Sequence, residues 1–363
     1  MSKITQNKMP SKTLNKQELF RLYAIMLHAR IFEETCSILY TSKLIAGFCH
    51  LYSGQEAIAV GIQSLLTQKD NTITAYRCHV HAIIARIYRQ DWDCKADNDD
   101  QICDFAQQYI EKYSQAKSVM SELMAKQTGC SKGKGGSMHL YDKEHNFYGG
   151  HGIVGIQIPL GVGLAFAEKY RSTNAVTFAS LGEGAMNQGQ VYEAMNMAAL
   201  WKLPIVFVCE NNGYAIGTSE RRHSAGSGLY KRGAAFDIPS YKINGMDILE
   251  VIEYAQKAKE HALTEGPVFL EMDTYRYRPH SMSDTASYRT REEVNSVKNT
   301  RDPIELLKNV LLTQHSVSPA IFEKYEKLER ERIEEARLYA IESPFPGQEE
   351  LQSDIWASPV MQN

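Results

Sequence analysis

Residues 181–190 read LGEGAMNQGQ, with two glycines flanking an acidic residue at the end of an apolar run. The run AVTFASL, residues 175–181, predicts a buried strand, and QGQVYEAMNMAALWK, residues 188–202, predicts a helix. A glycine-rich loop between a strand and a helix commonly binds phosphate, because backbone N–H groups at the helix N-terminus point toward the anion. The acidic residue, Glu183, is unusual in such a loop, since a carboxylate repels phosphate oxygens.

Strands and helices alternate along much of the chain. IVFVCE (205–210) and PVFLEMDTYR (267–276) predict two further apolar strands, and TITAY (72–76) predicts a shorter one. Asp247 and Glu250 have the spacing of a helix capping box between the later two strands. This alternation predicts an α/β fold with a mostly parallel sheet flanked by helices, in which ligands bind at the carboxyl ends of the strands.

The two ends of the chain are helical in pattern. A long helix is expected from Asn15 and a second at about 54–66. Asp302-Pro303 and Ser318-Pro319 each combine a capping residue with proline, which predicts two helix starts after a loop at 277–291.

We expect a single α/β domain over residues 15–345, preceded by a flexible segment, 1–14, and followed by a tail, 346–363. Residues 91–127 form a possible insert, which opens with DWDCKADNDDQ and continues as a polar helix over about 102–126. The acids of this segment lack the spacing of a calcium-binding loop, so we expect a solvated surface segment.

The composition predicts a globular cytoplasmic protein. Of 363 residues, 43% are hydrophobic, and 40 Lys+Arg against 43 Asp+Glu give a formal charge of -3. The sequence has no basic stripe for nucleic acid and no apolar run near the roughly 20 residues that span a membrane. The seven cysteines are scattered, and the start lacks the apolar core of a secretory signal. We therefore expect reduced thiols and a cytoplasmic rather than a mitochondrial location.

Two common phosphate-binding motifs do not fit the glycine-rich segments. The P-loop needs G-x-x-x-x-G-K-[ST], and the closest run, GCSKGKG at 129–135, is one residue short and lacks the hydroxyl for magnesium. The dinucleotide motif G-x-G-x-x-G would need glycine at Asn187 or at Phe166, and it has no acid beside the pyrophosphate. Glu210 could imitate the acid that binds ribose, but it lies 28 residues after Gly182 rather than about 20.

A divalent cation between Glu183 and the phosphates would turn repulsion into attraction. Magnesium prefers six hard oxygen ligands, including protein carboxylates and amides. Asn212 follows the next predicted strand, 29 residues after Glu183. One loop, one helix and one strand fill that interval, so the two side chains should emerge side by side at one sheet edge. The alternative is two polar loop tips with no ligand between them.

Gly182-x-Gly184 followed by Asn211-Asn212 resembles the metal and cofactor motif of thiamine-diphosphate-dependent enzymes. Longer sequence segments, in the same order, resemble those of one family. This is the family of alpha subunits of the thiamine-dependent dehydrogenase component of the pyruvate dehydrogenase complex. The resemblance runs from about residue 15 to 345. The segments that carry the resemblance are GFCHLYSGQEA (47–57), TAYR (74–77), SKGKGGSMH (131–139), FYGGHGIVG (147–155), NQGQVYEAMNMAALWKLP (187–204) and YRPHSMSD…YRTREE (277–293).

The resemblance implies thiamine diphosphate and Mg2+ as cofactors. It implies that the metal ligands are Glu183, Asn212 and the backbone carbonyl of Tyr214. Arg77 would offer a guanidinium fork to phosphate oxygens, and Val154 would equally suit a core position. The implied cofactor-binding residues are Tyr76, Arg77, Gly152, Val154, Gly182, Glu183, Gly184, Ala185, Asn212, Tyr214 and His280.

Two histidines, His50 and His280, match catalytic positions of the family, and an imidazole pKa of about 6.5 suits proton movement near neutral pH. The implied reaction is oxidative decarboxylation of pyruvate, with transfer of the acetyl group to the lipoyl group of an acyltransferase. The sequence has no second α/β unit to supply the glutamate that contacts the cofactor's aminopyrimidine ring. The resemblance therefore implies a beta subunit and an α2β2 assembly, with the glycine helix LGVGLAFA (160–167) in the core or at a subunit contact.

Some positions depart from the family. Glu183 stands where the family usually has aspartate, and Pro279 replaces a glycine before His280. Branched-chain 2-oxo acid dehydrogenases carry Gly-Glu-Gly, so the alpha subunit of a branched-chain or acetoin dehydrogenase is the alternative, whereas HSMSD and YRTREE favour pyruvate. A non-catalytic assembly subunit and a nicotinamide dehydrogenase are more remote alternatives. Ser281 and Ser287 match sites that kinases regulate in eukaryotic relatives, and we interpret them as loop hydroxyls.

Overall fold

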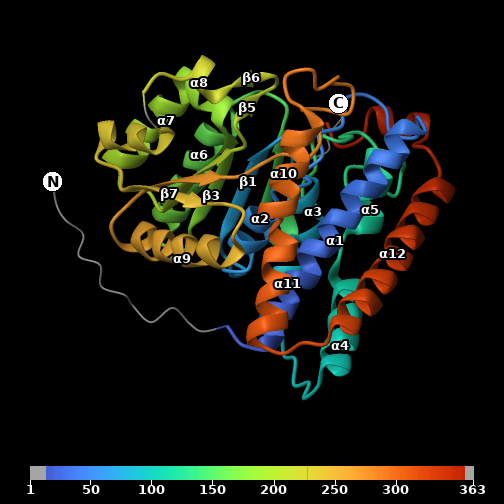
Figure 1. Ribbon diagram of the computed structural model, residues 1–363. Coiled ribbons are helices and arrows are strands. Elements are labelled where there is room, and N and C mark those ends of the chain that lie inside the picture. Colours follow the sequence, from blue (N-terminus) through green and yellow to red (C-terminus); the bar gives the residue numbers. More distant parts are fainter. Residues whose placement is uncertain (1–13, 227, 356–363) are drawn as a thin grey trace.

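Six parallel strands form the centre of the computed structural model, which describes residues 14–226 and 228–355 (Figure 1). Their order across the sheet is β2-β1-β3-β4-β8-β7. The strands are β1 (Asn71–Ala75), β2 (Phe147–His151), β3 (Thr177–Gly182), β4 (Ile205–Asn211), β7 (Ser240–Asn244) and β8 (Val268–Asp273). The predicted α/β fold with a parallel sheet flanked by helices is confirmed. The expected segment 1–14 lies outside the described residues apart from Leu14, and the structure describes 346–355 of the expected tail.

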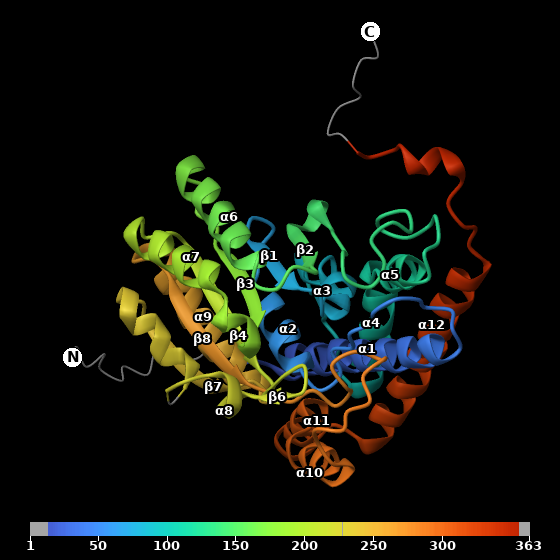
Figure 2. The same ribbon diagram turned by 90° about the horizontal axis from the view of Figure 1, so that it is seen from above.

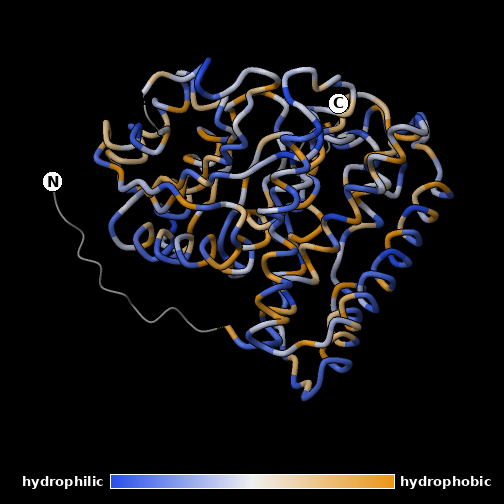
Figure 3. The backbone as a smooth tube through the Cα atoms, in the orientation of Figure 1, coloured by the Kyte–Doolittle hydropathy of each residue, from blue (hydrophilic) through white to orange (hydrophobic). Residues whose placement is uncertain are grey.

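Helices cover both faces of the sheet (Figure 2). Helices α6 (Gln157–Arg171) and α7 (Gly189–Leu200) pack on one face, and α2 (Glu56–Gln63) and α9 (Ile248–Thr264) pack on the other. Nearly every residue of β3, β4 and β8 is buried, as expected for parallel strands covered on both sides. Figure 3 shows hydrophobic residues gathered along the inner strands and mixed with hydrophilic residues along the outer helices.

A layer of helices packs beside the sheet and shares one hydrophobic core. It contains α1 (Lys16–Thr41), α3 (His79–Ile84), α4 (Asp99–Tyr113), α5 (Ala116–Leu123), α11 (Pro303–Gln314) and α12 (Pro319–Glu342). Further elements are α8 (Glu220–His223), α10 (Arg291–Arg301) and the hairpin of β5 (Tyr214–Ala215) and β6 (Thr218–Ser219). No helix within the described ranges is long and apolar enough to cross a membrane. All seven cysteines are free thiols.

Capping residues fix several helix starts. Asn15 forms a capping box at the start of α1, and Asp302 caps α11, so both helices begin where the sequence predicts. Asp247 caps α9, but the carboxylate of Glu250 accepts a hydrogen bond from the N–H of Asn244 rather than from the cap residue. The predicted capping box is therefore wrong, although the predicted helix is present.

The segment 91–127 is more deeply integrated than predicted. It forms two helices, α4 and α5, instead of one, because the chain leaves the helical conformation at Ser114. One face of α4, with Ile102, Ala106 and Ile110, is buried in the helical core against α1 and α12. The prediction of a solvated surface segment is wrong for this helix, since its amphipathic spacing gives it an inner face.

The sequence does not predict several of the elements, among them β2, β7 and α10. Strand β2 reads FYGGH, and its glycines weaken the strand pattern. Strand β7 reads SYKIN and lies at the sheet edge, where most of its residues are half-buried or exposed. Helix α10 follows the loop predicted at 277–291 and buries no residue, so it has no hydrophobic period to reveal it.

The glycine-rich segment GCSKGKGG, residues 129–136, surrounds a carboxylate of the protein itself. Glu122, which is fully buried, accepts hydrogen bonds from the backbone N–H groups of Ser131 and Gly133 on one oxygen and of Gly135 and Gly136 on the other. These four bonds are 2.7 to 3.1 Å long. The backbone amides that would bind phosphate in a P-loop are therefore occupied, which agrees with the failure of that motif.

We predict that Glu122→Ala lowers the free energy of unfolding by about 3 kcal/mol, because four loop amides lose a charged acceptor. Urea unfolding and thermal melting would measure the loss. The matched control is Glu111→Ala on α4, where the side chain is exposed, and it should change stability little. Equal stability of the two variants would show that the loop does not depend on Glu122.

Candidate active site

Glu183 and Asn212 lie next to each other at the carboxyl edge of the sheet. Strands β3 and β4 pair in register up to Gly182 and Glu210, so the chain positions that follow them meet at the same edge. The backbone N–H of Asn212 donates to Oε2 of Glu183 at 3.4 Å, and both side chains are buried. The structure therefore brings together the two residues that the spacing predicts to be neighbours.

Two of the predicted metal ligands share one cationic partner. Nη1 of Arg276 donates to Oδ1 of Asn212 at 3.3 Å and to the backbone carbonyl of Tyr214 at 3.2 Å. The two oxygens thus converge on one positive charge beside Glu183. Arg276 was not among the predicted site residues, and its signal in the sequence was its place as the last residue of the predicted strand 267–276.

Two buried guanidinium groups face this edge without a carboxylate as hydrogen-bond partner. Arg77, which follows β1, donates to the carbonyls of Leu51 at 2.5 Å and His280 at 3.0 Å. The bonds of Arg276 go to amide, carbonyl and hydroxyl oxygens. Burial, together with the charge of Arg276, lowers the pKa of Arg77 to about 10, so the Arg77 guanidinium stays cationic at neutral pH. Buried cations whose hydrogen-bond partners are neutral favour the binding of an anion at this edge.

The carboxylates at this edge are strongly desolvated. Burial raises the pKa of Glu183 above its usual range, against the opposing effect of backbone hydrogen bonds and of the two arginines. Burial also raises the pKa of Glu210 to about 7, and the charge of Glu183 adds to this rise. A nearby cation would favour the ionised form of both carboxyls.

His50, Tyr76 and His280 form an aromatic cluster on the other side of Arg77. Ring centroids lie 4.4 Å apart for His50 and Tyr76 and 5.1 Å apart for the two histidines. Nδ1 of His50 is buried and has no hydrogen-bond partner among the described residues. Burial and the charge of Arg77 lower the pKa of His50 to about 2 and that of His280 to about 4. Both imidazoles are therefore neutral near neutral pH, and each can donate a hydrogen bond from one ring nitrogen and accept one on the other.

The two glycines of the loop that contains Glu183 differ in the free space around them. A Cβ atom at Gly182 would meet no heavy atom within 4 Å, whereas at Gly184 it would lie 2.5 Å from Cβ of Ala215. Gly184 is thus required by packing, and Gly182 leaves open space at the end of β3. Ala185 is buried directly after them.

Gly152 and Val154 follow β2 at the same edge of the sheet. Val154 is 44% exposed and its neighbour Ile153 is 68% exposed, so the interpretation of Val154 as a core residue is wrong. The loop is held by the carbonyl of Val154, which accepts a hydrogen bond from Nε2 of Gln190 at 3.0 Å. It presents apolar side chains to the outside at the mouth of the site.

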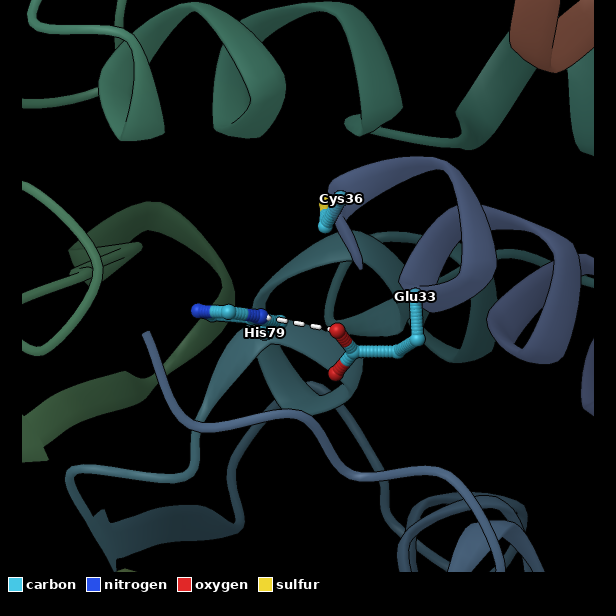
Figure 4. Close-up of side chains that lie close together, drawn as sticks. All are labelled: Glu33, Cys36 and His79. Atoms are coloured by element: carbon cyan, nitrogen blue, oxygen red, sulfur yellow. Dashed lines mark hydrogen bonds and ion pairs between the residues drawn. The ribbon is translucent and has the colours of Figure 1, made fainter. Parts of the chain in front are cut away.

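A different group of ligand-type residues, Glu33, Cys36 and His79, lies inside the helical layer (Figure 4). The Glu33 carboxylate accepts from Nδ1 of His79 at 2.9 Å and from the backbone N–H of Tyr52 at 2.9 Å. Nε2 of His79 lies 2.8 Å from Oγ of Ser137, and burial raises the pKa of the Cys36 thiol. These groups satisfy one another, so the cluster joins α1, α3 and the loop at 137 rather than forming an open metal site.

The sequence comparisons agree with this geometry. A family model described as "Dehydrogenase E1 component" matches residues 23–93 and 105–349, and the unmatched residues 94–104 fall inside the predicted insert. The chain is 46% identical over 345 residues to "Pyruvate dehydrogenase E1 component subunit alpha-1, mitochondrial" of Oryza sativa subsp. japonica, covering 95% of this chain and 81% of the relative. It is 48% identical over 343 residues to "Pyruvate dehydrogenase E1 component subunit alpha" of Zymomonas mobilis, covering 94% and 89%.

A protein of the same name from Rickettsia bellii is 44% identical over 342 residues, covering 94% of this chain and 96% of the relative. These matches extend over the sheet, the helical layer and all the candidate site residues. The chain therefore belongs to the dehydrogenase E1 component family, among relatives that are alpha subunits of pyruvate dehydrogenase.

Proposed function

We propose that this chain is the alpha subunit of a pyruvate dehydrogenase. With a beta subunit, it takes part in the thiamine-diphosphate-dependent oxidative decarboxylation of pyruvate and in the transfer of the acetyl group to the lipoyl group of an acyltransferase. One observation carries the proposal: buried Arg77 and Arg276, with only neutral partners, lie beside the adjacent Glu183 and Asn212 at the carboxyl edge of the sheet. This edge has positive groups for a diphosphate and hard oxygens for a metal.

The proposed metal is Mg2+, held by Glu183, Oδ1 of Asn212 and the carbonyl oxygen of Tyr214. These are hard oxygen ligands, and a diphosphate and water would complete six-coordination. The convergence of two of the oxygens on Nη1 of Arg276 supports this assignment, since they already accept from one positively charged group. A bound cation would also favour the ionised form of the desolvated Glu183.

In the proposed diphosphate site, the two buried arginines supply the positive charge and the end of β3 lines the site. Open space at Gly182 gives room for a close approach of the backbone to the cofactor. His280 is tied to the site because its carbonyl accepts from Arg77. The remaining cofactor contacts that we propose are Tyr76, Gly152, Val154, Gly184 and Ala185.

Thiamine diphosphate supplies the nucleophilic carbon and the electron sink that decarboxylation requires. The chain's own residues bind, orient and move protons. Nδ1 of His50 is buried without a hydrogen-bond partner among the described residues, and burial and the arginines keep the imidazole neutral, so it can donate a hydrogen bond from one ring nitrogen and accept one on the other. Tyr76 packs against both histidines, which also contact each other, so the three rings support one another's orientation.

The site is proposed to be completed by a beta subunit. The described ranges contain one parallel sheet, and no glutamate from a second α/β unit reaches the site. Several apolar side chains of α6 and the end of α7 are exposed, and we call this group of residues the α6–α7 face. Its exposed side chains are Leu160, Phe166, Tyr170, Met197, Leu200 and Trp201. Exposed apolar side chains gathered on two helices that pack together are typical of a subunit interface.

The substrate proposal rests on the relatives. All the named relatives above are alpha subunits of pyruvate dehydrogenase, which favours pyruvate over the branched-chain alternative suggested by Gly-Glu-Gly. The cytoplasmic location expected from the sequence stays a prediction, because relatives of both mitochondrial and bacterial origin are similar to the chain.

Glu183→Ala is predicted to abolish retention of magnesium and thiamine diphosphate by the complex with the beta subunit. Glu183→Asp should bind them equally well or better, because the carboxylate is kept. Titration calorimetry of the assembled complex would measure both, with Glu193→Ala, an exposed acid on α7, as the control. Undiminished binding by Glu183→Ala would remove this residue from the metal site.

The chain with its beta subunit should have a kcat/KM for pyruvate at least about tenfold higher than for branched-chain 2-oxo acids, since a pocket for a methyl group excludes larger side chains. The chain alone should be inactive, because its half of the site lacks the activating glutamate. Steady-state assays of the chain with and without the beta subunit would test both points. Full activity of the isolated chain would contradict the proposal.

Leu160→Asp should weaken association with the beta subunit at least about tenfold, because it places a charge on the α6–α7 face. Leu338→Asp on α12 is a matched control, since both leucines are 44% exposed. Sedimentation of mixtures with the beta subunit would give the two dissociation constants. Equal constants would place the contact elsewhere.

A further inference from the structure

Gln55 lies behind the proposed metal ligand Asn212 and joins it to Glu210. Nε2 of Gln55 donates to Oε2 of Glu210 at 2.7 Å, and Oε1 of Gln55 accepts from Nδ2 of Asn212 at 3.3 Å. Gln55 is 1% exposed, so water does not compete for these bonds. Two bonds therefore connect three buried side chains from the start of α2 to the end of β4.

Neither of these bonds serves the helix that Gln55 begins. Gln55 is the N-cap residue of α2, yet its side chain makes no capping hydrogen bond. Residues at this position usually bond to the first free N–H groups of the helix. Here both ends of the amide are directed to residues that follow or end β4, which points to a role at the site.

An asparagine ligand has an orientation problem that a carboxylate does not have. The oxygen and nitrogen ends of its amide are nearly equal in size, but only the oxygen can bind a cation. If the amide turned over, Nδ2 would point at the cation and the ligand would be lost. Packing cannot prevent this, so the hydrogen-bond partners must.

The hydrogen bond to Glu210 determines which end of each amide donates and which end accepts. Nε2 of Gln55 donates to Glu210, so the acceptor end of the same amide, Oε1, is left facing Asn212. Oε1 in turn selects Nδ2 of Asn212, and Oδ1 is left facing the place where Arg276 now donates. Each amide thus has one orientation that satisfies its neighbours.

We propose that Gln55 is a positioning residue that holds the amide of Asn212 with Oδ1 toward the cation. This inference rests on the proposed function, because it requires Asn212 to be a metal ligand. It adds a residue outside the predicted site, and residues of this kind commonly change metal affinity by about 10- to 100-fold.

The test uses the complex with the beta subunit and thiamine diphosphate at pH 8, with Mn2+ in place of Mg2+ and free Mn2+ measured by electron paramagnetic resonance. Gln55→Met keeps the length of the side chain and removes both polar ends. It should raise the Kd for Mn2+ about tenfold. At saturating Mn2+, kcat should return to the wild-type value and the KM for pyruvate should not change, as expected for a residue that acts only through the metal.

Gln63→Met is the matched control, because Gln63 is a second buried glutamine of α2 and its side chain donates to the carbonyl of His81, away from the site. It should leave the Kd for Mn2+ unchanged even if it lowers the melting temperature. A loss of stability alone would therefore not be mistaken for a loss of metal binding.

The decisive comparison repeats the Gln55→Met substitution in the Asn212→Asp variant. A carboxylate presents oxygen in either orientation, so Gln55→Met should no longer raise the Kd for Mn2+ when it is combined with Asn212→Asp. The inference is overturned if Gln55→Met alone leaves the Kd unchanged, or if it raises the Kd equally in both backgrounds. Absence of Mn2+ binding by the unmodified complex would instead overturn the proposed metal site, and the inference with it.

Discussion

Two buried guanidinium groups without an acidic hydrogen-bond partner are the constraint on which the site depends. Removing a cation from water is costly unless hydrogen bonds and opposite charge compensate for it. Arg77 and Arg276 have hydrogen bonds only to neutral oxygens, which include the carbonyls of Leu51, His280 and Tyr214. The charges of Glu183 and Glu210 act on these groups without a direct hydrogen bond, and a bound anion would add a direct partner. Burial and the same two charges keep His50 and His280 neutral, so anion binding and the protonation of the histidines are coupled through one electrostatic environment.

The order of the strands explains why these groups meet. After β1 the chain forms β2 on one side, and it then returns to form β3 on the other side of β1. At such a reversal, the loops that follow neighbouring strands diverge and leave a crevice at the carboxyl edge. Tyr76 and Arg77 follow β1, the Glu183 loop follows β3, Asn212 follows β4, and Arg276 and His280 follow β8. The helical layer contributes His50 and Gln55 from the segment between α1 and α2, so the site lies where the sheet and the helical core meet.

The elements and site residues that were predicted have a signal in a short stretch of sequence. Most of those that were missed depend on contacts that form only in the folded chain. Continuous apolar runs predicted β3, β4 and β8 because strands buried on both faces need them, whereas the glycines of β2 and the polar residues of β7 and α10 gave no such pattern. The proximity of Glu183 and Asn212 was predicted from topology, since their strands are consecutive. Arg276 and Gln55 were missed because their importance comes from burial and partners that only the folded chain creates. The core of α4 was missed because its acidic outer residues dominated the composition of that segment.

The carboxylate of Glu122 inside the glycine-rich loop has a consequence for the order of events in assembly. A loop that closes around an incoming phosphate becomes ordered only on binding, and the lost freedom weakens the affinity. This loop already encloses an anion that belongs to the chain, so it is ordered when the protein folds. Its far end carries Ser137, bonded to His79, and His139, which lies against Gly152. One wall of the crevice is thus preorganised before any cofactor arrives, and the entropy of forming that wall is lost in folding rather than in binding.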